Sequence, residues 1–177
     1  MSQIDASDFP SLRAAVEGSS NEELVKQIRQ AGARVKFITD GDVAGAIMAA
    51  REGTGVDMLV GIGGTPEAVI AACALKCLDA VMFGRLWPRN DEERRAALEQ
   101  GYELDKVLTI DDLVKGDNVF FAATGVTDGE LLRGVRFDRL GALTQSLSMR
   151  SKSGTSRQID ARHQLSKLSR YASIDYG

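Results

Sequence analysis

Two short apolar runs in this chain are each followed, within a few residues, by a glycine-containing turn and the start of a helix. The first run spans 35–38 and precedes Asp40-Gly41-Asp42 and a helical segment from 43 to about 51. The second spans 58–62 and precedes a Gly63-Gly64 turn and a further helix. Strands that alternate with helices in this way form parallel units with helices packed on a sheet. The pattern predicts a layered α/β fold with a mostly parallel sheet and flanking helices.

The last third of the chain has a different pattern. Leu143, Gln145, Leu147 and Met149 alternate with hydroxyl side chains, which is typical of a strand with one polar face. Together with residues 135–137 and a loop over 138–141, this strand predicts a C-terminal antiparallel hairpin.

The remaining segments allow shorter predictions. Residues 12–16 could form a helical turn, but residues 1–19 show no clear periodicity. Thr109 and Asp112 favour the start of a short helix, and 119–123 is expected to be a buried strand. From 164 onward the chain is polar and unpatterned, so we expect a frayed tail. No internal domain boundary is evident.

Composition limits the class of function. The chain has 177 residues and a formal net charge of −3, which argues against a dedicated nucleic-acid binder. Its longest apolar stretch, 68–75, is too short for a bilayer of about 30 Å at about 1.5 Å per residue. Two cysteines and no signal-peptide pattern lead us to expect a cytoplasmic protein with no membrane and no nucleic-acid partner.

The first loop with potential chemistry is Asp40-Gly41-Asp42, which follows a predicted strand. Ligands of parallel α/β sheets bind where strand ends meet helix starts. Glycine permits a close turn, and two carboxylates can accept from sugar hydroxyls or bind a cation. The same residues also suit a plain turn with a helix cap, and this alternative stays open.

The second loop is Gly61-Ile62-Gly63-Gly64, followed by Thr65-Pro66-Glu67. Glycines before a helix expose backbone N–H groups, which suits a phosphate, and Thr65 is expected to be the N-cap. No Walker lysine follows, and Pro66 replaces the last glycine of the dinucleotide fingerprint. Glu67, in the first helical turn, could ligate a divalent metal or only interact with the helix dipole.

Other candidates are weaker. Cys73 and Cys77 are expected to pack in the core, and His163 is expected to have an ordinary surface role. The basic run 150–157 could contact phosphate, but a solvated strand end is the preferred interpretation.

Several motifs, in order, resemble the class II fructose-1,6-bisphosphatases. They are GARVKFITDGDVAGAI, VGIGGTPEAVIAA, GRLWPRNDEER, KGDNVFFAATGVTDGELLRGVR and TQSLSMRSKSGT. The resemblance runs from about 21 to 163 and is closest to bacterial enzymes. It implies the layered α/β fold of the inositol monophosphatase-like phosphatases and divides the chain into a non-family, poorly ordered segment 1–20, a C-terminal family domain 21–163 and a polar tail 164–177.

The resemblance also implies an activity. The family are phosphoric monoester hydrolases that remove the 1-phosphate of fructose 1,6-bisphosphate, in gluconeogenesis and glycerol metabolism, with Mn²⁺ or Mg²⁺. Some members act on sedoheptulose 1,7-bisphosphate, and a homo-oligomer is expected for the full-length enzyme. By resemblance, Asp40, Gly41, Asp42 and Gly64 match substrate contacts and Glu67 matches a metal ligand.

The chain also departs from the family. The remaining metal carboxylates, the catalytic lysine and threonine, and a substrate-contacting tyrosine belong to an N-terminal half, so the resemblance places no catalytic residue here. A basic Lys/Arg-Pro-Arg segment is replaced by Gly18-Ser19-Ser20. The alternative function is therefore a non-catalytic sugar-phosphate-binding or interaction domain.

Overall fold

The structure is a computed structural model that describes residues 13–17, 22–38, 41–168 and 170. The chain divides into two compact units between Gly116 and Asp117, here called the N-terminal and C-terminal units. No proline- or serine-rich linker marks this division, so no internal boundary was predicted.

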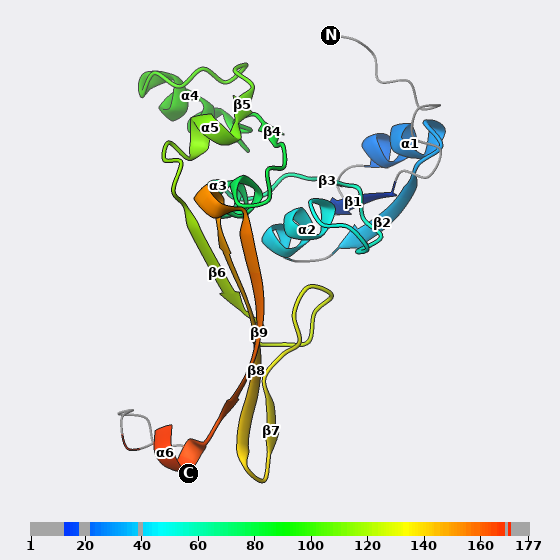
Figure 1. Ribbon diagram of the computed structural model, residues 1–177. Helices are drawn as coiled ribbons and strands as arrows, with labels where there is room; N and C mark the ends of the chain where they lie inside the picture. Colours follow the sequence, from blue (N-terminus) through cyan, green and yellow to red (C-terminus); the bar gives the residue numbers. More distant parts are fainter. Residues whose placement is uncertain (1–12, 18–21, 39–40, 169, 171–177) are drawn as a thin grey trace. The chain divides into compact units, whose positions relative to one another are not determined.

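The N-terminal unit contains β1 (Arg13–Glu17), α1 (Glu22–Gln30), β2 (Arg34–Ile38), α2 (Asp42–Ala49), β3 (Met58–Val60), α3 (Thr65–Lys76), β4 (Phe83–Gly84), α4 (Asp91–Glu99), β5 (Leu108–Thr109) and α5 (Ile110–Leu113). The C-terminal unit contains β6 (Phe120–Thr124), β7 (Arg136–Asp138), β8 (Gly141–Arg150), a 3-10 helix (Ser151–Ser153), β9 (Thr155–His163) and α6 (Leu165–Leu168). Figure 1 labels these elements.

The first sheet is parallel and has the strand order β2-β1-β3. Its central strand, β1, places Val16 opposite Phe37 of β2 and opposite Val60 of β3. The helical turn predicted over 12–16 is therefore wrong for 13–16. Pairing on both edges of β1 outweighs its local helical pattern, as tertiary context often does. This strand also falls within the segment 1–20 that the sequence predicted to be poorly ordered.

Helices α1 and α2 cover opposite faces of this sheet. Val35 packs against a buried cluster that includes Val25 of α1. Ile38, on the other face of β2, lies beneath α2: a Cβ built on Gly45 would stand 3.0 Å from Ile38 Cδ1 and 3.2 Å from Leu59 Cδ1. Positions 35 and 38 point to opposite faces because side chains alternate along a strand. The result is a three-layer helix–sheet–helix arrangement, with small residues where α2 meets the strands.

Helix α3 packs against α2 through small apolar side chains. Ala46 of α2 and Ala71 and Leu75 of α3 form one buried cluster, with Leu59 and Ile110 against it. Alanine at these contacts lets the two helices approach closely. Among the described residues, no helix is long and apolar enough to cross a membrane.

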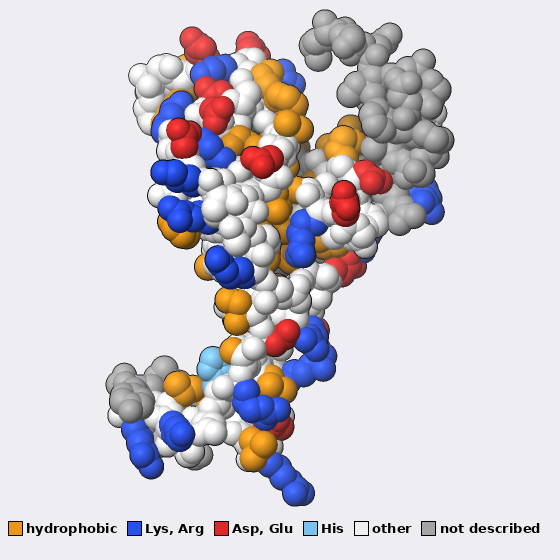
Figure 2. Space-filling model, in the orientation of Figure 1, with side chains coloured by type: hydrophobic (Ala, Val, Ile, Leu, Met, Phe, Trp, Pro, Cys, Tyr) orange, Lys and Arg blue, Asp and Glu red, His pale blue; other side chains and the backbone are white. Residues whose placement is uncertain are grey.

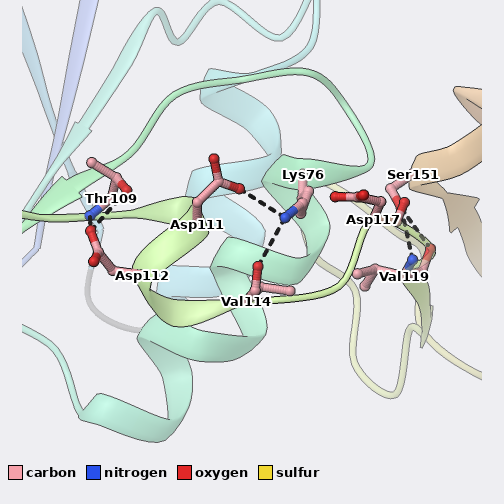
Figure 3. Close-up of polar contacts among 8 residues, drawn as sticks. All are labelled: Lys76, Thr109, Asp111, Asp112, Val114, Asp117, Val119 and Ser151. Atoms are coloured by element: carbon pink, nitrogen blue, oxygen red, sulfur yellow. Dashed lines mark hydrogen bonds and ion pairs between the residues drawn. The ribbon is translucent and has the colours of Figure 1, made fainter.

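Lysine 76 joins the end of α3 to α5. Its Nζ donates to Asp111 Oδ1 at 2.8 Å and to the Val114 carbonyl oxygen at 2.9 Å (Figure 3). The Lys76 side chain is 16% exposed, so it supplies a partner to a carbonyl that α5 leaves unpaired at its end.

The start of α5 has the predicted capping residues. Asp112 Oδ2 accepts from the backbone N of Thr109 at 3.0 Å and from its Oγ1 at 2.9 Å, as Figure 3 shows. The backbone N–H of Thr109 and then the Lys106 ammonium hold the pKa of Asp112 well below its usual range. The short helix predicted from Thr109 and Asp112 is confirmed.

Two further regions of this unit lie at the surface. Helix α4 has an Asn90 cap that accepts from Glu93 N at 2.8 Å, and charged side chains gather over it in Figure 2. Antiparallel strands β4 and β5 pair Phe83 with Thr109. Phe83 is 71% exposed and Trp87 is 66% exposed, so this region presents apolar side chains to its surroundings.

The C-terminal unit is an antiparallel sheet organised around β8. Residues 146–150 of β8 pair with β6 and 141–143 pair with β7, whereas 142–150 pair with β9 along the opposite edge. The hairpin of β7 and β8 confirms the predicted C-terminal antiparallel hairpin. Strand β9 was not predicted, because its exposed, charged sequence has no apolar alternation.

Burial along β8 alternates as predicted from Gln145 to Arg150, where Leu147 and Met149 are fully buried, but Leu143 and Thr144 are both half-buried. The predicted buried strand over 119–123 is present as β6, but only Phe121 of that strand is buried, because every second side chain of an edge strand faces outward.

The overall prediction of an α/β fold is confirmed. The three-stranded sheet of the N-terminal unit is parallel, but the β4–β5 pair of the same unit and the sheet of the C-terminal unit are antiparallel, so the prediction of a mostly parallel sheet is not confirmed. The parallel pattern is therefore confined to β1, β2 and β3, whose connections contain α1 and α2. Strands β7, β8 and β9 follow one another through short connections, which permit antiparallel pairing.

Candidate functional site

The first predicted loop lies between β2 and α2. Asp40 lies outside the described residues. Gly41 is the N-cap of α2 and has φ 95° and ψ 45°, a left-handed conformation that favours glycine. Its carbonyl oxygen accepts from Gly45 N at 2.9 Å. Asp42 is the first residue of α2 and is half-buried. The left-handed glycine thus turns the chain sharply and places the Asp42 carboxylate at the positive end of the helix.

The second predicted loop lies between β3 and α3, and its glycines are exposed. The N-cap of α3 is Gly64, with an extended backbone (φ −71°, ψ 150°), so the prediction of Thr65 as N-cap is wrong by one residue. Thr65 and Pro66 form the first turn, where proline needs no N–H partner. A glycine cap leaves the first backbone N–H groups of α3 uncovered by any capping side chain, which is the arrangement that suits an anion.

Glu67 folds back over this cap. A Cβ built on Gly64 would collide with Glu67 Oε2 and stand 3.2 Å from Glu67 Cδ. The absence of a side chain at Gly64 is therefore what gives the Glu67 carboxylate its place. The Glu67 side chain is exposed and forms no hydrogen bond or ion pair within the part of the chain that the structure describes. Its oxygens remain available to a ligand as well as to the dipole of α3.

The two loops share one edge of the sheet. Strands β2 and β3 are both parallel to β1, so their carboxyl ends lie on the same side, and α2 and α3 begin there. Strands β2 and β3 are not neighbours in the sheet, because β1 lies between them. In open α/β sheets, ligands bind outside the carboxyl ends of the strands, and both loops lie at that edge.

The donor set of this edge fits part of a divalent metal site. Glu67 offers an exposed carboxylate, and Mg²⁺-like ions use one or two protein carboxylates together with waters and substrate phosphate. Among the described residues, no three His, Cys, Asp or Glu side chains gather into a metal-binding cluster. Glu67 therefore fits as one ligand among others.

The weaker candidates from the sequence are held by packing or by hydrogen bonds within the fold. Cys77 is buried and Cys73 is half-buried, and neither forms a disulfide, in agreement with core packing. His163 is half-buried, and its Nε2 lies 2.9 Å from Thr144 Oγ1. In the basic run, Arg150 Nε donates to Asn118 Oδ1 at 2.8 Å, and its guanidinium lies 4.8 Å from the Phe120 ring centroid.

The turn after β8 is held by its serine. Ser151 Oγ accepts from Val119 N at 2.7 Å and donates to the Asp117 carbonyl oxygen at 2.7 Å (Figure 3). The serine of this basic run therefore has a structural role in joining β8 to the segment before β6.

Sequence reasoning missed one polar network. Gln145 is 6% exposed; its Oε1 accepts from Arg133 N at 2.9 Å and its Nε2 donates to Asp160 Oδ1 at 3.0 Å. Arg133 Nη2 also donates to Asp160, at 2.7 Å. These residues line a hollow of about 210 Å³ on the C-terminal unit. The sequence feature that could have indicated this network is Gln145 itself, which stands among the apolar residues of β8. A buried amide needs hydrogen-bond partners, so such a glutamine predicts polar neighbours.

Comparison with known proteins gives one family. A model described as bacterial fructose-1,6-bisphosphatase, glpX-encoded, matches residues 14–163. The match begins within β1, seven residues before the start that the sequence motifs suggested.

Curated relatives agree with this match. Two Synechococcus proteins, from strains JA-3-3Ab and JA-2-3B'a(2-13), are named D-fructose 1,6-bisphosphatase class 2/sedoheptulose 1,7-bisphosphatase. They are 49% and 48% identical to this chain over 154 residues, which is 80% of the chain and 44% of each relative. A Gloeobacter violaceus protein of the same name is 42% identical over 156 residues, covering 81% of the chain and 45% of the relative. The chain thus spans less than half the length of these relatives.

Proposed function

Because this chain belongs to the glpX-encoded bacterial fructose-1,6-bisphosphatase family, we propose that it forms the substrate-binding part of a sugar-bisphosphate phosphatase. The substrate would be fructose 1,6-bisphosphate, and the reaction would be hydrolysis of its 1-phosphate. Sedoheptulose 1,7-bisphosphate is a second substrate of the same chemistry, in line with the names of the relatives. The observation that supports this proposal most directly is the position of Gly41, Gly64 and Glu67 at two helix starts on one sheet edge.

Each residue would have a distinct task. Asp40 and Asp42 would accept hydrogen bonds from sugar hydroxyls, with Gly41 turning the backbone so that both carboxylates follow β2. Gly64 would contact the substrate through its backbone, beside the N–H groups that open α3.

Glu67 would hold one divalent cation, Mn²⁺ or Mg²⁺, with the other ligands supplied from outside this chain. When bound, such a cation neutralises charge on the transferring phosphoryl group and lowers the pKa of a bound water. Glu67 would contribute its exposed carboxylate in a position that the missing side chain of Gly64 leaves open.

The test uses a full-length context. Residues 14–163 replace the matched segment of the Synechococcus JA-3-3Ab relative, and phosphate release from fructose 1,6-bisphosphate is measured with and without Mn²⁺. We expect metal-dependent release in the chimera and its loss in Glu67→Ala, with Cys73→Ala as the unaffected control. A folded chimera that binds the sugar bisphosphate without hydrolysing it supports the alternative, a non-catalytic binding domain. Full activity in Glu67→Ala contradicts the metal role.

A further inference from the structure

The edge strand of the C-terminal unit is long and has one unpaired side. Strand β9 pairs along its whole length with β8, and the described residues contain no strand on its other edge. Ile159 stands at the middle of β9 and is 44% exposed. A nine-residue edge with an exposed apolar centre is a template for pairing with another strand.

The hydrogen bonds of β8 show which residues of β9 face outward. Gly125 N donates to the Gln145 carbonyl oxygen at 3.0 Å, so odd-numbered residues of β8 direct their backbone groups toward β6 and β7. Even-numbered residues of β8 therefore direct theirs toward β9, where they oppose odd-numbered residues such as Ile159, the partner of Ser146. The backbone groups left for a new partner belong to four residues of β9: Ser156, Gln158, Asp160 and Arg162.

Two charged residues of β9, Asp160 and Arg162, have ion-pair partners within the C-terminal unit. Asp160 accepts from Arg133 Nη2 at 2.7 Å, and Arg162 Nη1 donates to Asp138 Oδ2 at 2.6 Å. Isolated charges on an edge strand commonly prevent strand addition. Here the two charged residues with outward backbone groups already have partners, so that protection is weakened.

In one antiparallel register of two β9 strands, the exposed apolar side chain of Ile159 would meet its own copy. We propose that β9 pairs with β9 of a second copy of this chain about a two-fold axis at Ile159. The residues with outward backbone groups then oppose one another, Gln158 with Asp160 and Ser156 with Arg162, which allows about eight backbone hydrogen bonds. Gln158 can donate its side-chain amide to the carboxylate of Asp160, and two Ile159 side chains meet at the axis.

Neighbouring registers are less favourable. An axis at Asp160 would place two aspartates directly opposite each other, which is destabilising. An axis at Gln158 would place Ile159 opposite Arg157 and leave the apolar side chain without an apolar partner. An axis at Ala161 would place Asp160 opposite Arg162, but both side chains are already ion-paired within their own copy, and Ile159 would lie opposite His163. The register centred on Ile159 is therefore the one that the exposed apolar side chain favours, and two-fold symmetry of this kind is typical of homodimers.

The first experiment is disulfide trapping. In the proposed register, residue 159 opposes itself in a non-hydrogen-bonded pair, with Cβ atoms about 4.5–5.5 Å apart, close to the reach of a disulfide. Mild oxidation of Ile159→Cys should give a covalent dimer. Ala161→Cys is the matched control, because the two copies of residue 161 would lie about 13 Å apart along the strands. The unsubstituted chain controls for Cys73 and Cys77. Trapping through 161 and not through 159 would overturn the proposal.

The second experiment measures mass by sedimentation over a roughly hundredfold range of concentration. We expect a dimer that dissociates on dilution and is lost in Ile159→Lys, whereas Val126→Lys, at a side chain 77% exposed elsewhere in the same unit, should keep it. A chain that is monomeric throughout, or a dimer retained in Ile159→Lys, would refute the pairing. If circular dichroism shows that Ile159→Lys unfolds, the trapping result decides.

A final comparison tests whether the free edge of β9 pairs with a second copy of the chain or with another part of the full-length protein. If Ile159→Cys traps the chain alone but not the full-length chimera, the remaining part of the family protein occupies this edge and the proposal fails. Trapping in both supports β9–β9 pairing in the complete protein.

Discussion

Alanine at position 64 should move the Glu67 carboxylate without harming the fold. The backbone of Gly64, at φ −71° and ψ 150°, is open to alanine, so no strain arises in the main chain. The new Cβ would overlap only the end of the flexible Glu67 side chain. That carboxylate has to shift by about 1 Å or more to reach ordinary van der Waals separation.

The Gly64→Ala substitution should change the stability of the fold little and the catalytic rate much more. Replacing glycine by alanine at a compatible backbone gains about 0.4–1 kcal/mol through the unfolded chain, and the poorer alanine cap costs a similar amount. Stability should therefore change by less than about 1 kcal/mol. A displacement of about 1 Å at a catalytic group can lower a rate about a hundredfold, equivalent to about 2.7 kcal/mol.

The assay is a double-mutant cycle in the full-length chimera, with kcat/KM and thermal stability measured for Gly64→Ala, Glu67→Ala and both together. If Gly64 acts by making room for Glu67, the double variant should be no slower than Glu67→Ala alone. Gly116→Ala is the control, because a Cβ there meets no atom within 4 Å. Additive losses, or a Gly64→Ala variant whose stability falls with its activity, would refute this reasoning.

Three further outcomes are expected in the isolated chain. Gly134→Ala should destabilise by more than about 2 kcal/mol in urea denaturation, because its Cβ would stand 2.6 Å from the backbone N of Asp128; an unchanged midpoint would contradict the close approach. Lys76→Met should cost about 1–3 kcal/mol by leaving the Val114 carbonyl unpaired, with the midpoint again as the measurement. The Arg162 guanidinium and the backbone N–H of Leu140 hold the pKa of Asp138 below its ordinary value. The contribution of Asp138 to the free energy of unfolding should therefore be complete above about pH 4 and be lost as the pH falls further. When the melting temperature is plotted against pH, Asp138→Asn should give a flatter curve than the unsubstituted chain below about pH 4. Identical curves would contradict the role of the Asp138–Arg162 pair.

Much of the site was predictable from short-range patterns. Gly41 and Gly64 precede helices because glycine takes backbone conformations that other residues resist or leaves helix N–H groups open, and both effects are local. The same holds for the Thr109–Asp112 cap, where a three-residue spacing is sufficient to define the contact. The alternation along β8 likewise fixed which of its side chains are buried from Gln145 to Arg150.

The order of strands was not predictable in this way. Nothing in residues 13–17 marks them as the centre of a sheet, since that position arises only from pairing with β2 on one side and β3 on the other. Because β1 lies between β2 and β3, the two candidate loops lie at one edge of the sheet without being neighbours. Strand pairing is a long-range contact, and the sequence of one strand contains little information about which strand lies beside it.

The sequence by itself determined where the chain turns, where α2, α3 and α5 begin, and which family the motifs resemble, because each of these depends on residues a few positions apart. Only the tertiary structure decided that Glu67 lies against Gly64, that Gln145 is held by Arg133 and Asp160, and that β9 is an edge strand. Those features depend on side-chain rotamers and on pairing between distant segments, where packing and hydrogen bonding across the fold outweigh local preference.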